Sequence, residues 1–259
     1  MVIFYTTVEG LEPRLMCYPY IVCNPWSYSE CLQYLSMCRD VVKSIIFDTG
    51  VEKLFKRMNL RDYPEWYIKQ YVSMVKRIAV QYGRSIEVVY TIPDIPVDYP
   101  NRESLYPWNV QRTVEYIELF RDRYIDYLKP ALAMPVVQGR KDDIRSVLDT
   151  YFRYEHLYNE FPLIGLGPTC STKNWLLLGR LIVSFDRNVM RPFHSFGAHL
   201  KAIEWVLKWK PRNFRSFDSS AYHWIKDENG VHRVKTRKES VESLKRYIER
   251  LRGIGVVVD

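Results

Sequence analysis

Short apolar runs alternate with longer amphipathic stretches along this chain of 259 residues. Eight of the runs are rich in Val, Ile and Phe and are bounded by Gly or Pro, which is typical of strands buried in a parallel sheet. They span residues 2–7, 44–50, 86–94, 132–139, 162–167, 192–197, 214–219 and 253–259. Between them, apolar residues recur at helical spacing. These helical patterns span 28–41, 64–82, 108–128, 141–157, 172–186, 198–209 and 238–252.

Eight strands that alternate with helices predict a (β/α)8 TIM barrel, because eight parallel strands close into a barrel. Residues 1–259 are expected to form one domain, since such a barrel takes about 250 residues. Before the last helix, residues 221–236 form a run with Asn229 and Gly230 near its middle. This pattern predicts a β-hairpin inserted after the seventh strand. Ser240 is the expected N-cap of the last helix.

Polar residues or glycines stand at the ends of six successive predicted strands, where the active sites of such barrels lie. They are Asp48, Asp94, Gln138, the pair Gly165 and Gly167, His194, and Asp218. A single Asp at a strand end is often the N-cap of the next helix, and this alternative stays open for Asp48 and Asp94. Six such positions in a row nevertheless predict one polar site at the mouth of the barrel.

Three carboxylates and an amide suit the cleavage of a glycosidic bond beside a polar heterocycle. One carboxylate can attack the anomeric carbon and form a covalent glycosyl-enzyme, while a second passes a proton to and from the leaving base. No closely spaced pair of metal ligands is present among these residues, so neither a metal nor another cofactor is expected. The sequence also lacks a G-x-S-x-G turn, a P-loop and a dinucleotide fingerprint.

The formal net charge is +8, and from Lys201 onward there are 14 Lys and Arg against 8 Asp and Glu. This excess favours an anionic partner, nucleic acid first, although a mildly basic surface without such a role stays an alternative. Candidate phosphate contacts flank the last strand end and the hairpin. They are Arg212, Arg215, Lys226, Arg233 and Lys235.

The five cysteines include no C-x-x-C pair, which argues against a zinc site. The first residues carry no basic segment of a signal peptide, and no apolar run reaches the roughly 18 residues of a membrane span. A cytoplasmic protein without membrane contact and with mostly reduced thiols is therefore expected. A disulfide among the first four cysteines stays open for a hyperthermophilic source.

The order of the strand-end motifs resembles the tRNA-guanine transglycosylase superfamily, closest to the branch that places 7-deazaguanine bases in DNA. The resemblance covers about Ile45 to Trp224. Its motifs are FDTG (47–50), TIPD (91–94), VVQG (136–139), IGLG (164–167), HSFG (194–197) and SFDSS (216–220). The resemblance implies that Asp218 is the nucleophile and Asp48 the acid/base. It further implies that the base is bound by Asp94, Gln138, Gly139, Gly165, Leu166, Gly167, His194 and Gly197.

The implied activity is that of a pentosyltransferase, which exchanges guanine in a nucleic acid for a 7-deazaguanine such as preQ0 through a covalent aspartyl intermediate. Aromatic residues that could stack on the base are Tyr90, Tyr222 and Trp224. The superfamily's tRNA enzymes carry a zinc subdomain after the nucleophile. No cysteine follows Cys170 here, which predicts that the subdomain is absent. Its absence favours DNA as substrate, with tRNA as the alternative.

Val51 departs from the family, which has a small residue at this position. A catalytically inactive, nucleic-acid-binding barrel therefore stays open as a second reading. A third is a hydrolase that releases 7-deazaguanine, with water in place of the incoming base. Members of the superfamily often dimerise, which leaves a homodimer as an option.

Overall fold

The computed structural model describes residues 1–97, 105–170, 172–227 and 230–259, with the backbone alone for 225–227 and 230–231. Nine parallel strands form one sheet in the order β5-β4-β3-β2-β1-β9-β8-β7-β6. They are β1 (Ile3–Thr7), β2 (Tyr20–Cys23), β3 (Ser44–Phe47), β4 (Glu87–Thr91), β5 (Leu132–Met134), β6 (Val136–Val137), β7 (Ile164–Leu166), β8 (Phe193–Ser195) and β9 (Phe214–Asp218).

The sheet curls into a nearly closed barrel, because its two edge strands, β5 and β6, are separated in the chain only by Pro135. On one side, the Ile92 N–H donates to the Met134 carbonyl at 2.9 Å. On the other side, the Gly165 N–H donates to the Pro135 carbonyl at 2.8 Å. Pro135 has no N–H, so the ladder of backbone hydrogen bonds is interrupted at this residue. Its carbonyl still accepts the hydrogen bond from Gly165. The two short strands occupy one place in the barrel, and the predicted parallel α/β barrel is confirmed.

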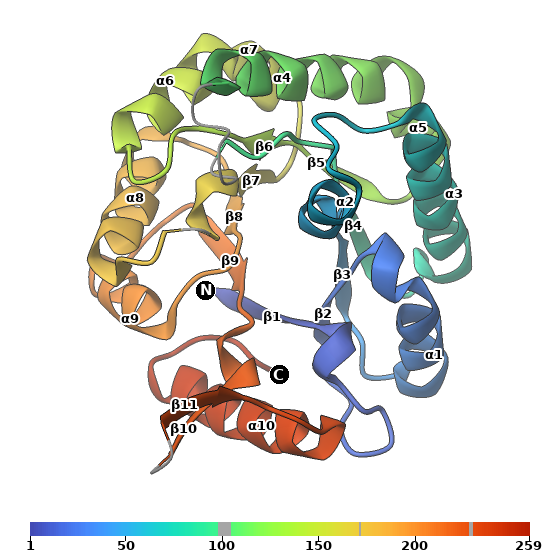
Figure 1. Cartoon of the computed structure of the whole chain (residues 1–259), viewed down its shortest axis with the longest axis vertical. Helices are drawn as coiled ribbons and strands as arrows, with labels where there is room; N and C mark the ends of the chain where they lie inside the picture. Colours follow the sequence, from blue (N-terminus) through green and yellow to red (C-terminus); the bar gives the residue numbers. More distant parts are fainter. Residues whose placement is uncertain (98–104, 171, 228–229) are drawn as a thin grey trace.

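The helices form an outer ring around the strands, except α2, which lies inside that ring in the view of Figure 1. They are α1 (Tyr28–Cys38), α2 (Val51–Met58), α3 (Glu65–Tyr82), α4 (Tyr106–Arg123), α5 (Ile125–Leu128), α6 (Ile144–Arg153), α7 (Glu155–Tyr158), α8 (Trp175–Asn188), α9 (Leu200–Lys208) and α10 (Arg237–Gly253). The fully described stretch between β1 and β2 holds only the 3-10 turn η1 (Val8–Gly10). No described helix is both long and apolar enough to cross a membrane.

The predicted hairpin is present as β10 (Trp224–Asp227) and β11 (Gly230–Arg233), which pair antiparallel after β9. Asn229, the first residue of its expected turn, lies outside the described residues. The helix that follows begins earlier than predicted, since Thr236 and not Ser240 is its N-cap. The Thr236 hydroxyl accepts a hydrogen bond from the Glu239 N–H at 3.1 Å, and the Glu239 carboxylate accepts one from the Thr236 N–H, which forms a capping box.

Two strand predictions need correction. The second strand of the barrel is β2, a run of four residues between Pro19 and Asn24 that the pattern did not single out. The run 253–259 is not a strand of the barrel, and only Val257 bridges to Ile3. The reason is that β2 already pairs with β1 at Thr6 and Thr7, which leaves the tail only the first residues of β1.

Four of the five cysteines form disulfides, contrary to the expectation of mostly reduced thiols. Cys17 is bonded to Cys38 and Cys23 to Cys31, with Cα atoms 5.5 and 6.0 Å apart. Both bonds join β2, or the loop that leads into it, to α1. The short second strand is thus held covalently to the helix that follows it.

Candidate active site

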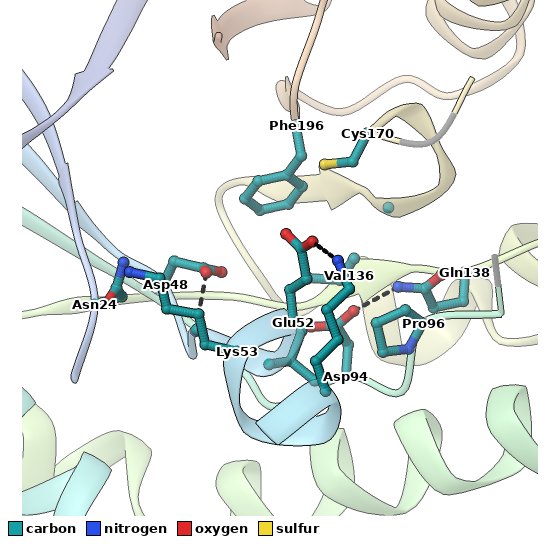
Figure 2. Close-up of a pocket in the computed structure, with 14 residues that line it drawn as sticks. Asn24, Asp48, Glu52, Lys53, Asp94, Pro96, Val136, Gln138, Cys170 and Phe196 are labelled. Carbon is teal, nitrogen blue, oxygen red and sulfur yellow. Dashed lines mark hydrogen bonds and ion pairs between the residues drawn. The ribbon is translucent and has the colours of Figure 1, made fainter. Parts of the chain in front are cut away.

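A cavity of about 380 Å³ opens at the carboxyl ends of the strands (Figure 2). This volume falls within the range of small-molecule sites. The wall comes from the ends of several strands and from α2. It consists of Asn24, Asp48, Gly50, Val51, Glu52, Lys53, Lys56, Asp94, Pro96, Val136, Gln138, Gly167, Cys170 and Phe196. Four of the residues predicted from the sequence, Asp48, Asp94, Gln138 and Gly167, are therefore brought together.

Asp94 and Gln138 form a buried polar pair in this wall. The Gln138 amide donates to the Asp94 carboxylate, and the two residues are only 2% and 7% exposed, respectively. A Cβ on Gly167 would lie 2.5 Å from the Gln138 nitrogen, so any larger residue at this position would displace the amide. The Gln138 carbonyl oxygen is buried and has no hydrogen-bond partner among the described residues. A buried acceptor of this kind suits an N–H donor of a bound ligand.

Asp48 lies across the cavity from Gln138 in the view of Figure 2. Its carboxylate accepts hydrogen bonds from the Gly50 N–H at 2.9 Å and from the Thr91 hydroxyl at 3.4 Å. Burial, joined by the negative charge of Asp218, raises the pKa of Asp48 above that of a free aspartate. The side chain therefore keeps its proton to higher pH than usual, which suits a group that both gives and takes a proton.

Gly50 explains why the FDTG motif ends in glycine. Its φ of +65° is left-handed, and a Cβ would lie 2.7 Å from the Trp26 ring. The Trp26 indole N–H also donates to the Gly50 carbonyl at 3.1 Å. The tight turn that presents the Gly50 N–H to Asp48 is thus fixed from behind by Trp26.

Three tyrosines support the strand ends that carry Asp48 and Asp94. The Tyr63 hydroxyl donates to the Asp94 carbonyl at 3.0 Å, and the Tyr67 hydroxyl to the Thr49 carbonyl at 2.6 Å. The Tyr71 hydroxyl reaches the carbonyls of Phe47 at 2.9 Å and Thr91 at 2.6 Å. Their spacing of four residues places the three on one face of α3 and of the turn before it.

Asp218 lies beside the cavity and is not part of its wall. Its carboxylate, at the end of β9, is 16% exposed and accepts a hydrogen bond from the Gly197 N–H at 3.0 Å. Its contact with Gly197 places it next to the cavity, because Phe196, the neighbour of Gly197, lines the wall.

His194 and Gly197 therefore do not line the cavity as predicted, because they hold Asp218. The His194 ring is fully buried between Ser216 and Asp218, with its nitrogens 2.9 and 3.1 Å from their side-chain oxygens. A neutral imidazole satisfies both contacts when Nε2–H donates to Asp218 and Nδ1 accepts the Ser216 hydroxyl proton. His194 is a positioning residue in this arrangement.

Three further residues predicted to bind the base, the latter two through their backbone, are not part of the cavity wall: Gly139, Gly165 and Leu166. A Cβ on Gly139 would lie 2.3 Å from Val147, so this glycine lets the strand end approach α6. Gly165 makes room for the Phe196 ring, which would be 2.7 Å from its Cβ. Leu166 is completely buried in the core. Because residues alternate along a strand, only some positions of each motif can face the cavity.

Two of the predicted phosphate contacts lie at the opposite end of the barrel. Arg212 belongs to the loop that leads into β9, where its N–H donates to Asp186 at 3.0 Å. Arg215 is the second residue of β9, near Tyr20 at the start of β2. Burial raises the pKa of Tyr20, and the charge of Arg215 opposes that increase. A strand's first residues and its end face opposite openings of the barrel, which the linear sequence does not reveal.

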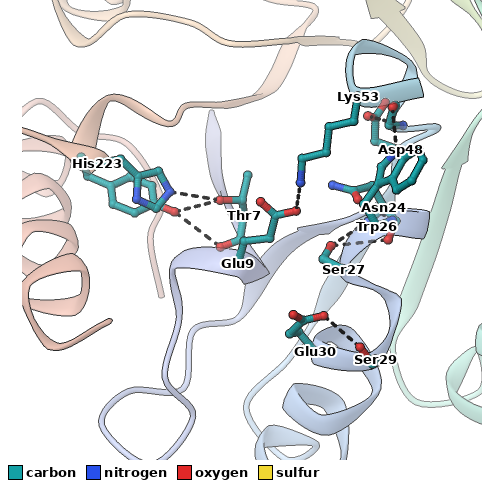
Figure 3. A network of polar contacts seen from close by, with 12 residues as sticks. Thr7, Glu9, Asn24, Trp26, Ser27, Ser29, Glu30, Asp48, Lys53 and His223 are labelled. Atoms are coloured by element: carbon teal, nitrogen blue, oxygen red, sulfur yellow. Dashed lines mark hydrogen bonds and ion pairs between the residues drawn. The ribbon is translucent and has the colours of Figure 1, made fainter. Parts of the chain in front are cut away.

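Arg233 at the end of β11 and Lys235 just after it are exposed. The side chain of Lys226 lies outside the described residues. A polar network joins this region to the cavity (Figure 3). The Thr7 hydroxyl lies 3.5 Å from the His223 ring, and Glu9, two residues on, forms an ion pair with Lys53 beside Asp48.

The sequence patterns missed the aromatic residue of the cavity. Phe196 lines the wall, whereas Tyr90 and Tyr222 are buried in the core and Trp224 lies outside this cavity. Asn24 and the face of α2 with Glu52 and Lys53 were also missed. Asn24 directly follows β2, so the strand-end rule would have found it if that strand had been recognised.

No group of three or more His, Cys, Asp and Glu side chains in the described ranges is arranged to hold a metal ion. In comparisons with known proteins, no family model matches the chain, and no curated protein matches it. The resemblance to the transglycosylases therefore stays a hypothesis that rests on the motifs themselves.

Proposed function

We propose that this protein exchanges guanine in a nucleic acid for a 7-deazaguanine base such as preQ0. The observation that carries the proposal is that two carboxylates lie in the wall of one cavity and a third lies beside it. Asp48 and Asp94 belong to the wall, and Asp218 accepts a hydrogen bond from Gly197, whose neighbour Phe196 lines the cavity. An acid with a raised pKa beside a second carboxyl group is a pairing typical of glycosyl transfer.

In the first step the target nucleotide leaves its stack and its base enters the cavity, at a cost of a few kcal/mol. An Asp218 oxygen attacks C1′ as the bond from C1′ to the guanine nitrogen breaks. The electron pair of that bond stays with guanine, which takes the proton held by Asp48. The sugar is then joined to Asp218 as an ester.

In the second step Asp48 accepts the proton of the incoming 7-deazaguanine as its ring nitrogen attacks C1′. The bond between C1′ and Asp218 breaks, which restores both carboxyl groups to their starting states. Asp94 and Gln138 would hold either base by the same edge. The Phe196 ring, half-buried in the cavity wall, would stack on its face.

DNA is the favoured polymer in this proposal, because we find no motif for the zinc subdomain that the superfamily's tRNA enzymes carry. Val51, which departs from the family, forms part of the cavity wall as a half-buried apolar side chain. It supplies apolar contact area to a flat ring, so the departure is compatible with base binding.

Asp218→Asn tests the proposal, because it removes the attacking charge at little steric cost. The parent protein should incorporate labelled guanine or preQ0 into duplex DNA and form a covalent adduct that the variant cannot form. Parallel reactions with tRNA distinguish the two polymers, and release of base without incorporation would indicate hydrolysis. Incorporation by the variant at the parent rate would exclude Asp218 as nucleophile.

A further inference from the structure

A second cavity, of about 660 Å³, lies beside the segment that follows Asp218. It is bounded by the starts of α8 and α9, by the turn η5 (Ala221–His223) and by one face of α10, which Figure 1 shows at the edge of the barrel. Six of its residues form what we call the basic groove. They are Lys173, Trp175, Lys201, Trp224, Arg246 and Arg250.

The positive charge of the basic groove is not neutralised by acidic residues in its own wall. The lining contains no Asp or Glu, and none of its four cations forms an ion pair within the described ranges. Arg246 and Arg250 are one turn apart on α10, where two like charges reduce helix stability. An anionic ligand that lies across both side chains would offset this repulsion.

Two indoles flank these cations. Trp175 is 40% and Trp224 56% exposed, so both rings are accessible to a ligand in the groove. The start of α9 also borders the groove at Leu200 and Lys201, and its N-cap residue, His199, makes no side-chain cap. Uncapped N–H groups at a helix start favour phosphate, and exposed indoles favour stacked bases.

The basic groove is close to the proposed nucleophile. Ala221, Tyr222 and Trp224 line it, and they follow Asp218 by only three, four and six residues along the chain. A polymer whose sugar reaches Asp218 would therefore have its neighbouring phosphates near this groove.

We infer that the basic groove holds a single-stranded segment of nucleic acid next to the nucleotide that enters the barrel mouth. Its phosphates lie on the four cations, and a base stacks on Trp224. The choice of nucleic acid as the ligand rests on the proposed function, whereas a general site for polyanions is the competing outcome of the test.

The test is the binding of a fluorescein-labelled single-stranded DNA of about 12 nucleotides, measured by anisotropy over a range of NaCl concentrations. Arg246→Gln with Arg250→Gln should weaken binding at least tenfold. It should also reduce the slope of log Kd against log salt by about 1.4, as expected for two lost phosphate contacts. The control, Lys43→Gln with Lys245→Gln, removes two exposed charges outside the groove and should bind like the parent.

Trp224→Ala, a change at an exposed position that spares the core, should weaken binding about tenfold and leave the salt slope unchanged. Equal binding by the groove and control variants, or by Trp224→Ala and the parent, would overturn the inference. So would polyglutamate that competes as strongly as the oligonucleotide. No base exchange is needed in this assay, so a failure of the proposed function leaves its result readable. If exchange occurs, the groove variant should raise KM for the polymer and leave kcat intact.

Discussion

His194 and Asp218 face each other across neighbouring strands, with Nε2 of the histidine 3.1 Å from Oδ1 of the aspartate. The imidazole is wholly buried, and Ser216 holds its other nitrogen at 2.9 Å. The aspartate proposed as nucleophile is thus supported from inside the barrel by a chain of hydrogen bonds, and its orientation depends on two buried side chains.

His194→Phe keeps most of the ring volume and removes both polar contacts. We expect the free energy of unfolding to fall by about 1–3 kcal/mol, because buried groups on Ser216 and Asp218 lose their partners. The kcat of base exchange should fall roughly hundredfold, as a misplaced nucleophile predicts, while KM for the base changes little. Thermal unfolding and exchange kinetics check both effects.

His194→Gln, which can still donate to Asp218, should recover part of the kcat lost in His194→Phe. The exposed His156 offers a control, since His156→Phe should alter neither quantity. An unchanged kcat in His194→Phe would show that Asp218 needs no such support.

Asp48 should make stability depend on pH. Burial and the charge of Asp218 raise its pKa above the ordinary value of 3.8, so the folded protein binds this proton more tightly than the unfolded chain. The resulting stabilisation is complete below about pH 4 and is lost as pH rises through the raised pKa. Asp48→Asn, whose amide oxygen can still accept from Gly50, should therefore be more stable than the parent near neutral pH.

That advantage of Asp48→Asn should shrink towards about pH 4, which denaturant unfolding at several pH values would reveal. Asp218→Asn should lower the pKa of Asp48 by removing the like charge, a shift that carboxyl NMR can follow. A stability difference that stays constant with pH would contradict the raised pKa.

Gly50→Ala tests the turn beneath Asp48. A left-handed alanine costs about 1–2 kcal/mol, and its Cβ would also displace the Trp26 ring. Gly253→Ala is the matched control, because nothing lies within 4 Å of its Cβ at the end of α10. It should be neutral or stabilise by up to about 1 kcal/mol. Equal effects of the two changes on unfolding would dismiss the strain at Gly50.

Much of the fold could be predicted from the sequence because hydrophobic periodicity reports which faces are buried. Seven of the eight apolar runs contain strands of the barrel. The pattern failed at β2, where the four residues between Pro19 and Asn24 are too few to show a period. It failed again at 253–259, where the residues are apolar but β2 limits access to β1.

The site was predictable only in part, because the sequence locates strand ends and says little about side-chain direction. Asp48, Asp94 and Gln138 were found at the cavity because their side chains face inward at the strand ends. Phe196 was missed, since an aromatic ring in a strand-end motif resembles any core residue. Arg215 was misplaced because nearness to Asp218 in sequence was taken as nearness at the barrel mouth.

Phe196→Ala should weaken binding of the base about tenfold, as expected for the loss of one stacking partner. The relevant quantity is KM for preQ0 or guanine in the exchange reaction. Phe152→Ala removes a ring that is 48% exposed on α6 and should leave KM unchanged. A normal KM in Phe196→Ala would assign the base to another part of the cavity.

The two disulfides should contribute to stability, each by about 2–4 kcal/mol. Alkylation of the unfolded, unreduced protein should label Cys170 alone, which mass spectrometry can establish. Reduction should expose all five thiols and lower the free energy of unfolding. Labelling of the first four cysteines without reductant would show that they are thiols.

Three tyrosine hydroxyls on α3 and the turn before it have a consequence for how this protein can vary. Tyr63, Tyr67 and Tyr71 bond the backbone of both strands that carry Asp48 and Asp94, and none of the three lines the cavity. Replacement of any of them by Phe deletes a single oxygen atom outside the cavity wall. The positions of Asp48 and Asp94 are thereby tied to residues that a survey of the cavity alone would treat as interchangeable packing.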